Sequence, residues 1–273
     1  MVAAVILWGG SAGLAKYLFQ RDYSPLIITQ TRTSIAFVLL GTWFAWRDRS
    51  VFRVARRDIL RLLFVGVVGL AFTNFTYYYT VSEASVAAAI LIQYTAPALV
   101  MVYMVLVARE ERGSPIKVGA LGLAMLGCYL AVKGEGASLA LPGWSLVSGP
   151  ATAICFAVMI VGSKQLLRIY SQWTVLTYLF GIAAAFWLCV HPPWAVLAEG
   201  YTAPDWGVFL VFSIVSVLVP LMVGRPVATG SRPTLGATLS CKAVAVSLVA
   251  PATTVLLLSP FGFSPTGEAF NLR

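Results

Sequence analysis

Residues 85–133 contain two long apolar segments joined by a short charged turn. The segments SVAAAILIQYTAPALVMVYMVLV and VGALGLAMLGCYLAVK flank the turn AREERGSPIK. A helix rises about 1.5 Å per residue, so about 20 apolar residues cross the bilayer's hydrocarbon core of about 30 Å. Gly113, Ser114 and Pro115 lie in the turn, where one helix must end and another begin. The stretch predicts a transmembrane helical hairpin whose charged turn lies at a membrane surface.

The composition extends this prediction to the whole chain. Of the 273 residues, 59% are apolar and 11% are charged, and the mean hydropathy is +0.86, whereas soluble domains contain about 25% charged residues. We therefore expect an all-α polytopic membrane protein. The net charge of +9 comes from basic residues in the loops, without an aromatic-interleaved basic face, which argues against a nucleic-acid partner. The four cysteines lack the spacing of metal ligands, and no metal site is predicted.

Apolar segments along the chain predict about nine transmembrane helices. They are expected at residues 2–19, 26–46, 59–80, 85–107, 118–133, 144–167, 173–190, 206–223 and 237–258.

The distribution of basic residues predicts the orientation of these helices. The loop over residues 47–61 contains six arginines against Asp48 and Asp58. Alternate loops, starting with this one, hold thirteen lysines and arginines, and the intervening loops hold two. Cytoplasmic loops carry this excess of positive charge, so we expect a multi-pass protein of the cell inner membrane with a cytoplasmic N-terminus.

A short internal echo suggests that the chain contains two related halves. Arg21-Asp22-Tyr23-Ser24 follows the first predicted helix, and Arg168-Ile169-Tyr170-Ser171 follows the sixth, at an offset of 147 residues. Five helices precede the second copy, so the two copies enter the membrane from opposite sides. This arrangement is typical of inverted-repeat transporters, which bind their substrate between the halves near the midplane.

The hairpin and the start of the chain also carry the motifs of a known family. The motifs are Ala87-Ala88-Ala89, Tyr94-Thr95-Ala96-Pro97, Glu111-Arg112 followed by Pro115, Trp8-Gly9, Ser24-Pro25, and Arg32 with Ala36. Over residues 1–223 the sequence resembles the EamA branch of the drug/metabolite transporter superfamily. The resemblance implies ten helices in two inverted halves that move small metabolites, such as amino acids, without a cofactor. The expected partners are a small-molecule substrate and the lipid bilayer, and homodimer formation is left open.

The end of the chain departs from the family pattern. The resemblance implies a Glu-Pro in the ninth helix, a Gly-Glu turn and a tenth helix. Residues 224–273 contain no Glu-Pro and no apolar segment after 237–258 long enough to span a membrane, and Lys242 lies within that ninth segment. We expect a first repeat over residues 1–136, an incomplete second repeat over residues 137–258 and an atypical tail over residues 259–273. A non-transporting or degenerate relative is the alternative.

Polar and aromatic residues within the spans are the candidates for a substrate site. A charge inside a span costs about 2.5 to 3.5 kcal/mol, so Arg32 requires either a cavity-facing role or a structural pair. A cavity arginine attracts carboxylates and phosphates, which favours anionic or zwitterionic solutes. For the aromatic residues, anchoring at the membrane interface is the alternative role. The predicted cavity residues are Trp8, Ser11, Arg32, Tyr78, Gln93, Tyr94, Pro97 and Tyr178.

An intramembrane serine hydrolase is the rival interpretation. Residues 9–13 match the pattern G-x-S-x-G, with Ser11 as nucleophile and His191 as the sole histidine. That motif requires a strand-to-helix turn, and here it lies within a predicted helix, so we expect no catalytic residues and no enzyme. All ten carboxylates lie in loops, at helix ends or in the tail, and no Walker-type loop is present. The sequence therefore favours a facilitator or exchanger over an ATP-driven pump.

Overall fold

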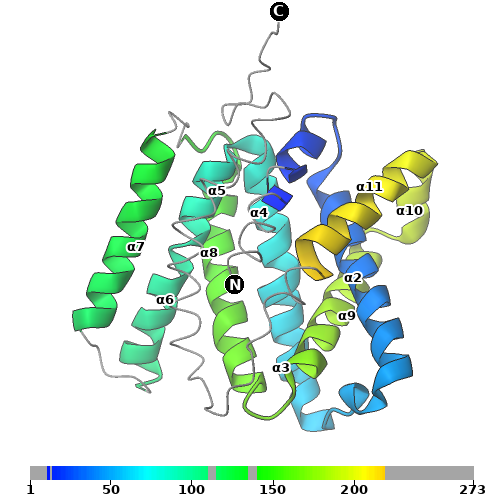
Figure 1. The fold of residues 1–273 in the computed structure, drawn as a ribbon, viewed down its shortest axis with the longest axis horizontal. Coiled ribbons are helices and arrows are strands. Elements are labelled where there is room, and N and C mark those ends of the chain that lie inside the picture. Colours follow the sequence, from blue (N-terminus) through cyan, green and yellow to red (C-terminus); the bar gives the residue numbers. More distant parts are fainter. Residues whose placement is uncertain (1–10, 13, 110–114, 135–139, 219–273) are drawn as a thin grey trace, which may run out of the picture.

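A computed structural model describes residues 11–12, 14–109, 115–134 and 140–218, and these residues contain no β-strand (Figure 1). The helical elements, of which η1 and η2 are 3-10 helices and η3 to η5 are π-helices, are α2 (Pro25–Arg47), η1 (Arg49–Phe52), η2 (Arg56–Asp58), α3 (Ile59–Phe64), η3 (Val65–Ala71), α4 (Phe72–Glu83), α5 (Val86–Gln93), α6 (Ala96–Val102), η4 (Tyr103–Val107), α7 (Pro115–Gly134), α8 (Ser145–Leu166), α9 (Gln172–Val190), α10 (Pro193–Ala198), α11 (Ala203–Ser213) and η5 (Ile214–Leu218).

The all-α prediction is confirmed, and the described helices fall where apolar segments predicted them. By length and composition, four of these helices can cross a membrane: Arg56–Glu83, Val86–Val107, Ser145–Leu166 and Gln172–Val190. The predicted spans at residues 26–46 and 118–133 coincide with α2 and α7. The predicted ninth helix at residues 237–258 lies outside the described residues.

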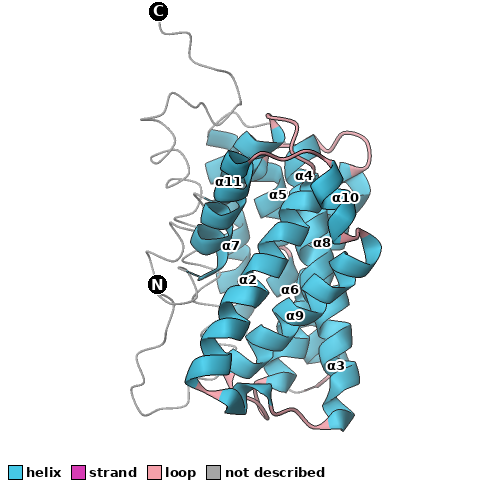
Figure 2. Cartoon of the chain, turned by 90° about the vertical axis from the view of Figure 1, so that its right-hand side faces the viewer, coloured by secondary structure: helices cyan, strands magenta, loops and turns pink. Residues whose placement is uncertain are grey.

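The long helices lie side by side, with their axes roughly parallel (Figures 1 and 2). Helix α2 packs against α9 and α11, whereas α4 packs against α8, and η3 contacts both α8 and α9. Helix α7 lies at one edge of the bundle (Figure 1). Elements far apart in the sequence therefore form the interior, where a site between the halves is expected.

Close helix contact fixes the position of η3 between α8 and α9. A Cβ atom added to Gly162 of α8 would lie 2.2 Å from Val65 Cγ2, closer than two carbon atoms can approach. Val65 is buried with Leu62, Leu166, Val175 and Leu179 in one apolar cluster. Small residues allow helix backbones to approach in a membrane, where lipid offers no hydrophobic driving force between helices. Glycine at position 162 therefore sets the spacing between α8 and η3.

Two features break the regular pattern of spans. The loop after α9 contains the short helix α10, with Pro193 at its first position, where the missing N–H of proline costs no helical hydrogen bond. The span Val86–Val107 is interrupted at Tyr94 and Thr95, between α5 and α6. Pro97 cannot donate a hydrogen bond to the Gln93 carbonyl, which explains a break at this point.

The outer surface of the bundle is strongly apolar. Leu106 is 67% exposed, Leu123 is 71% exposed and Leu146 is 64% exposed. In water such side chains would form large unfavourable patches, but hydrocarbon solvates them without cost. The exposed leucines thus agree with a protein that lies in a bilayer.

Candidate substrate site

Arg32 lies at the centre of a polar cluster that joins three helices. Its Nη1 donates to Asn74 Oδ1 at 2.6 Å, its Nε donates to Ser216 Oγ at 2.9 Å, and its Nη2 donates to the Ser216 carbonyl at 3.4 Å. The guanidinium carbon lies 5.4 Å from the centre of the Tyr78 ring, in a cation–π contact. Residues from α2, α4 and η5 thus surround one positive charge.

The local sequence of α2 explains why Arg32 points towards its partners. Pro25 starts the helix, so Arg32 lies two turns inside it, about 10 Å from its first residue at about 1.5 Å per residue. The neighbouring Thr29, Thr31 and Thr33 donate to carbonyls of the preceding turn in the same helix. The threonine hydroxyls therefore find their hydrogen-bond acceptors within α2, whereas the longer arginine side chain reaches acceptors on other helices.

In the described ranges of the chain, the Arg32 guanidinium is hydrogen-bonded but forms no ion pair. The guanidinium donates to an amide oxygen, a hydroxyl and a backbone carbonyl, all of them neutral groups. In the described part of the chain, ion pairs form at Asp58, with Arg57 and Arg61, and none involves Arg32. A cation at this depth in hydrocarbon is costly unless an anion joins it. The arrangement can therefore accept the carboxylate or phosphate of a ligand.

Aromatic side chains cover one side of this cluster. Tyr78 is buried, and its ring contacts the ring of Tyr77 at 5.4 Å between centroids. Helix α5, which ends at Gln93, contacts α4, which carries Tyr77 and Tyr78. Tyr94 lies at the break between α5 and α6. Phenol rings beside a cation offer stacking surfaces and hydroxyl groups to an organic ligand.

The structure brings some of the predicted residues together and leaves others apart. Arg32 and Tyr78 are in contact, and the half-buried Gln93, Tyr94 and Pro97 lie together at the break of one span. Trp8 lies outside the described residues.

Two further predicted residues lie in other surroundings. Ser11 is buried, and the Tyr178 hydroxyl donates to the Phe52 carbonyl at 2.8 Å. Phe52 ends η1, in the connection between α2 and α3. The contact therefore ties Tyr178 to the end of the bundle at which that connection lies.

Sequence reasoning missed part of the cluster. Ser216 and Asn74 are not among the predicted cavity residues, although both are polar residues inside apolar segments. Lys16 donates to the carbonyls of Val81, Ser82 and Ala84 at the end of α4. A lysine at a helix C-terminus satisfies carbonyls that lack helical partners.

The histidine of the rival hydrolase interpretation has a partner on α2. His191 Nδ1 lies 3.1 Å from Gln30 Oε1, and Gln30 Nε2 donates to the His191 carbonyl at 2.7 Å. Gln30 therefore holds both the ring and the backbone of His191, which gives this residue a structural role at the end of α9.

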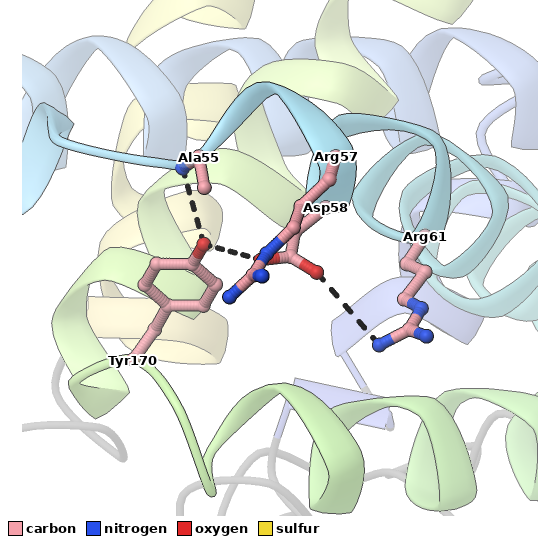
Figure 3. Close-up of polar contacts among 5 residues, drawn as sticks. All are labelled: Ala55, Arg57, Asp58, Arg61 and Tyr170. Atoms are coloured by element: carbon pink, nitrogen blue, oxygen red, sulfur yellow. Dashed lines mark hydrogen bonds and ion pairs between the residues drawn. The ribbon is translucent and has the colours of Figure 1, made fainter.

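A second polar cluster lies at the start of α3 (Figure 3). The Tyr170 hydroxyl donates to Asp58 Oδ2 at 2.7 Å and accepts from the Ala55 amide at 3.1 Å. Arg57 and Arg61 each lie 3.7 Å from the Asp58 carboxylate. The hydrogen bond to this carboxylate raises the pKa of Tyr170 above its ordinary value, because the neutral phenol is the donor.

The two arginines of this cluster also border a hollow in the surface. It has a volume of about 250 Å³ and is lined by Arg57, Asp58, Arg61 and Ile169. Both arginine side chains are largely exposed, so solvent screens their ion pairs with Asp58.

Comparisons with known proteins agree with this fold and with the motifs in the hairpin. The model of the EamA-like transporter family matches residues 1–133. The uncharacterized inner membrane transporter YicL of Salmonella typhimurium is 26% identical over 179 residues, which cover 64% of this chain and 59% of that protein. The match thus spans less than two thirds of the relative's length.

A solved crystal structure is similar over nearly the whole chain. It has a TM-score of 0.55 and 20% sequence identity, and the match covers 96% of each chain. At this identity the likeness establishes the polytopic helical fold alone. The family match covers the predicted first repeat, from the segment around Trp8 to the end of α7. Residues 1–133, just under half of the chain, are therefore similar to the EamA-like transporter family.

Proposed function

We propose that this chain is a multi-pass inner-membrane carrier for small organic solutes that bear a carboxylate or a phosphate, with zwitterions such as amino acids as the favoured class and export as the favoured direction. The name of the Salmonella relative and the family match over residues 1–133 support a transporter of the inner membrane. The loop rich in arginine before α3 would face the cytoplasm, together with the N-terminus.

The positive charge of Arg32 is the observation that carries the substrate class. Hydrogen bonds from a guanidinium to neutral oxygens hold the side chain in place and leave its charge uncompensated. An anionic ligand would supply the missing charge, and a bidentate contact suits the planar geometry of arginine. The Arg32 partners would then exchange with the ligand during binding.

The interrupted span Val86–Val107 supports a site at the same depth. Broken helices in transporters expose backbone groups to a cavity near the midplane of the bilayer. Tyr94 lies at this break, and α5, which precedes the break, contacts α4, which carries Asn74 and Tyr78 of the Arg32 cluster. Rocking of the two predicted halves would expose this region to each side of the membrane in turn.

The coupling of transport to an energy source follows from the position of the carboxylates. The described acids Asp48, Asp58, Glu199 and Asp205 lie in connections or at helix ends. A proton-coupled carrier usually places an acid within the membrane. We therefore propose facilitated transport or exchange, and solute flux should persist when the pH gradient is dissipated.

Reconstituted liposomes provide the test. Purified protein would be assayed with labelled zwitterionic, anionic and cationic amino acids, comparing wild type with Arg32→Gln. Because one hydrogen bond to a charged group contributes about 1.5 to 3 kcal/mol, kcat/KM for zwitterions and anions should fall by about 10- to 100-fold. Arg47→Gln, which removes an exposed arginine at the other end of α2, is the matched control and should transport normally.

Two outcomes would overturn the proposal. Transport of zwitterions by Arg32→Gln at the wild-type rate would remove Arg32 from the site. Absence of flux for every solute class with folded wild-type protein would favour the non-transporting alternative.

A further inference from the structure

The two sequence echoes each contain a tyrosine, and the two tyrosines have the same kind of partner. The Tyr170 hydroxyl donates to the carboxylate of Asp58, and the Tyr23 hydroxyl donates to the carboxylate of Asp205. Tyr23 and Tyr170 precede α2 and α9, respectively. Each tyrosine therefore lies just before one of two long helices, α2 and α9, that pack against each other.

The aspartates repeat at the same interval as the tyrosines. Tyr170 follows Tyr23 by 147 residues, and Asp205 follows Asp58 by 147 residues. In each pair the tyrosine belongs to one predicted half and the aspartate to the other. Exchanging the halves converts one pair into the other, which is what a two-fold relation between the halves produces.

The backbone around the aspartates repeats as well. Asp58 immediately precedes α3, and Asp205 lies in the first turn of α11. The residue three positions before each aspartate, Ala55 or Thr202, presents its amide to the pair. The Ala55 amide donates to the Tyr170 hydroxyl at 3.1 Å, and the Thr202 amide donates to Asp205 Oδ2 at 2.7 Å. Asp205 forms a capping box with Thr202 at the start of α11, and the Tyr170 hydroxyl binds the amide just before η2.

The two pairs lie at opposite ends of the bundle. In both views α3 starts at the lower end, whereas α10 and the start of α11 lie at the upper end (Figures 1 and 2). The close-up shows the Tyr170 ring pointing from the start of α9 towards Asp58 (Figure 3). In a bilayer one pair would lie at each membrane surface.

We propose that Tyr170–Asp58 and Tyr23–Asp205 are paired latches, each of which closes the boundary between the two halves at one membrane face. This inference rests on the proposed carrier function, in which the halves rock against each other. Both latches are closed in this structure. Opening towards one face breaks the latch at that face and leaves the other intact, so one hydroxyl–carboxylate bond is lost at a time.

The chemistry of the pair suits a latch. A hydroxyl that donates to a carboxylate forms a charge-assisted bond, which is about twice as strong as a bond between neutral groups. Water at a membrane surface replaces both partners when the pair opens, so the pair can break without burying an unpaired charge. Removing one hydroxyl should therefore raise the ratio of open to closed molecules at that end by about 10-fold.

Two buried positions, one near each latch, can report the opening of the bundle at that end. Ile28 and Val175 are 147 residues apart, and both are buried, in the clusters around Phe209 and Leu62, respectively. Each would be replaced singly by cysteine in a cysteine-free background, and the rate of maleimide labelling would be measured in native membranes. Tyr170→Phe should raise the labelling rate at position 175 by about 10-fold and leave the rate at position 28 unchanged. Tyr23→Phe should raise the labelling rate at position 28 by about 10-fold and leave the rate at position 175 unchanged.

Tyr201→Phe is the matched control. Its hydroxyl donates to Glu199 two residues away, at 3.2 Å, so this hydrogen bond stays within one predicted half, and phenylalanine keeps the ring that stacks on Tyr23. It should leave both labelling rates unchanged. Equal acceleration at both positions by either latch variant would indicate general destabilisation and would overturn the inference, as would unchanged rates in both variants.

The labelling experiment distinguishes this inference from the proposed function, because it requires no substrate. Opposite labelling changes in a protein that moves no solute would support the latches and contradict the carrier. Solute transport without opposite labelling changes would support the carrier and contradict the latches.

Discussion

Arg32 Nη1 donates a 2.6 Å hydrogen bond to Asn74 Oδ1, and this contact joins α2 to α4 across 42 residues of sequence. Asn74 is itself held by the Leu70 carbonyl, which accepts from its Nδ2 at 2.9 Å. The amide is therefore oriented so that its oxygen faces the guanidinium group. One charged side chain and one oriented amide define the centre of the candidate site.

Removing this amide should destabilise the protein. Asn74→Ala leaves one N–H of Arg32 without its partner in a region away from water, and the free energy of unfolding should fall by about 1 to 3 kcal/mol. Thr42→Ala is the control, since Thr42 is exposed and bonds the Val38 carbonyl of its own helix. Unfolding in mixed detergent micelles measures both variants. Equal stability of the two variants would mean that Arg32 does not depend on Asn74.

Filling the contact between α8 and η3 should also be costly. The added methyl of Gly162→Ala would overlap Val65 Cγ2, and overpacking typically costs about 1 to 3 kcal/mol. The second substitution Val65→Ala should recover part of that loss, which a double-mutant cycle on thermal unfolding would detect. Gly207→Ala, with no atom within 4 Å of the added Cβ, should have little effect. Additive losses at positions 162 and 65 would contradict direct contact.

Acid should weaken the start of α11 through Asp205. Hydrogen bonds from the Thr202 hydroxyl and then from Tyr23 lower the pKa of Asp205 below 3.8. A carboxyl with a lowered folded-state pKa stabilises the fold above its unfolded-state pKa, and this contribution is lost as pH falls through the folded-state pKa. The melting temperature of Asp205→Asn should therefore depend less on pH below about 4 than that of wild type.

A second variant separates this effect from loss of the side chain. Thr202→Val removes the hydroxyl donor and keeps the carboxylate, so the pKa of Asp205 should rise towards its ordinary value. The acid-induced fall in melting temperature should then begin at higher pH than in wild type. Identical acid profiles for wild type, Asp205→Asn and Thr202→Val would refute this role of Asp205.

Repairing the broken span should separate stability from transport. Pro97→Ala restores an N–H that can reach the Gln93 carbonyl, so the span Val86–Val107 can close its interrupted helix. We expect a higher melting temperature and slower solute flux, because the break would no longer expose backbone groups to the site. Thermal unfolding and liposome flux measured on the same preparation provide the test. A variant with unchanged flux would show that the break serves packing alone.

Local sequence patterns were sufficient to predict the helices. The bounds of α2, α8 and α9 lie within two residues of the predicted segments at 26–46, 144–167 and 173–190, because apolar length is a property of consecutive residues. Pro97 in the sequence indicated the helix break at Tyr94 and Thr95. No local sequence feature indicated the hydrogen-bond partners of Arg32, since Ser216 lies 184 residues from it.

The sequence alone determined that this chain is a helical membrane protein with an arginine inside one span, because hydropathy and charge act locally along the chain. It also contained the repeat of 147 residues that relates Tyr23 to Tyr170. Only the tertiary structure decided that each tyrosine bonds an aspartate of the other predicted half, and that Arg32 has neutral partners. Side chains so far apart in sequence meet only when helix packing brings them together, and a local pattern does not encode that packing.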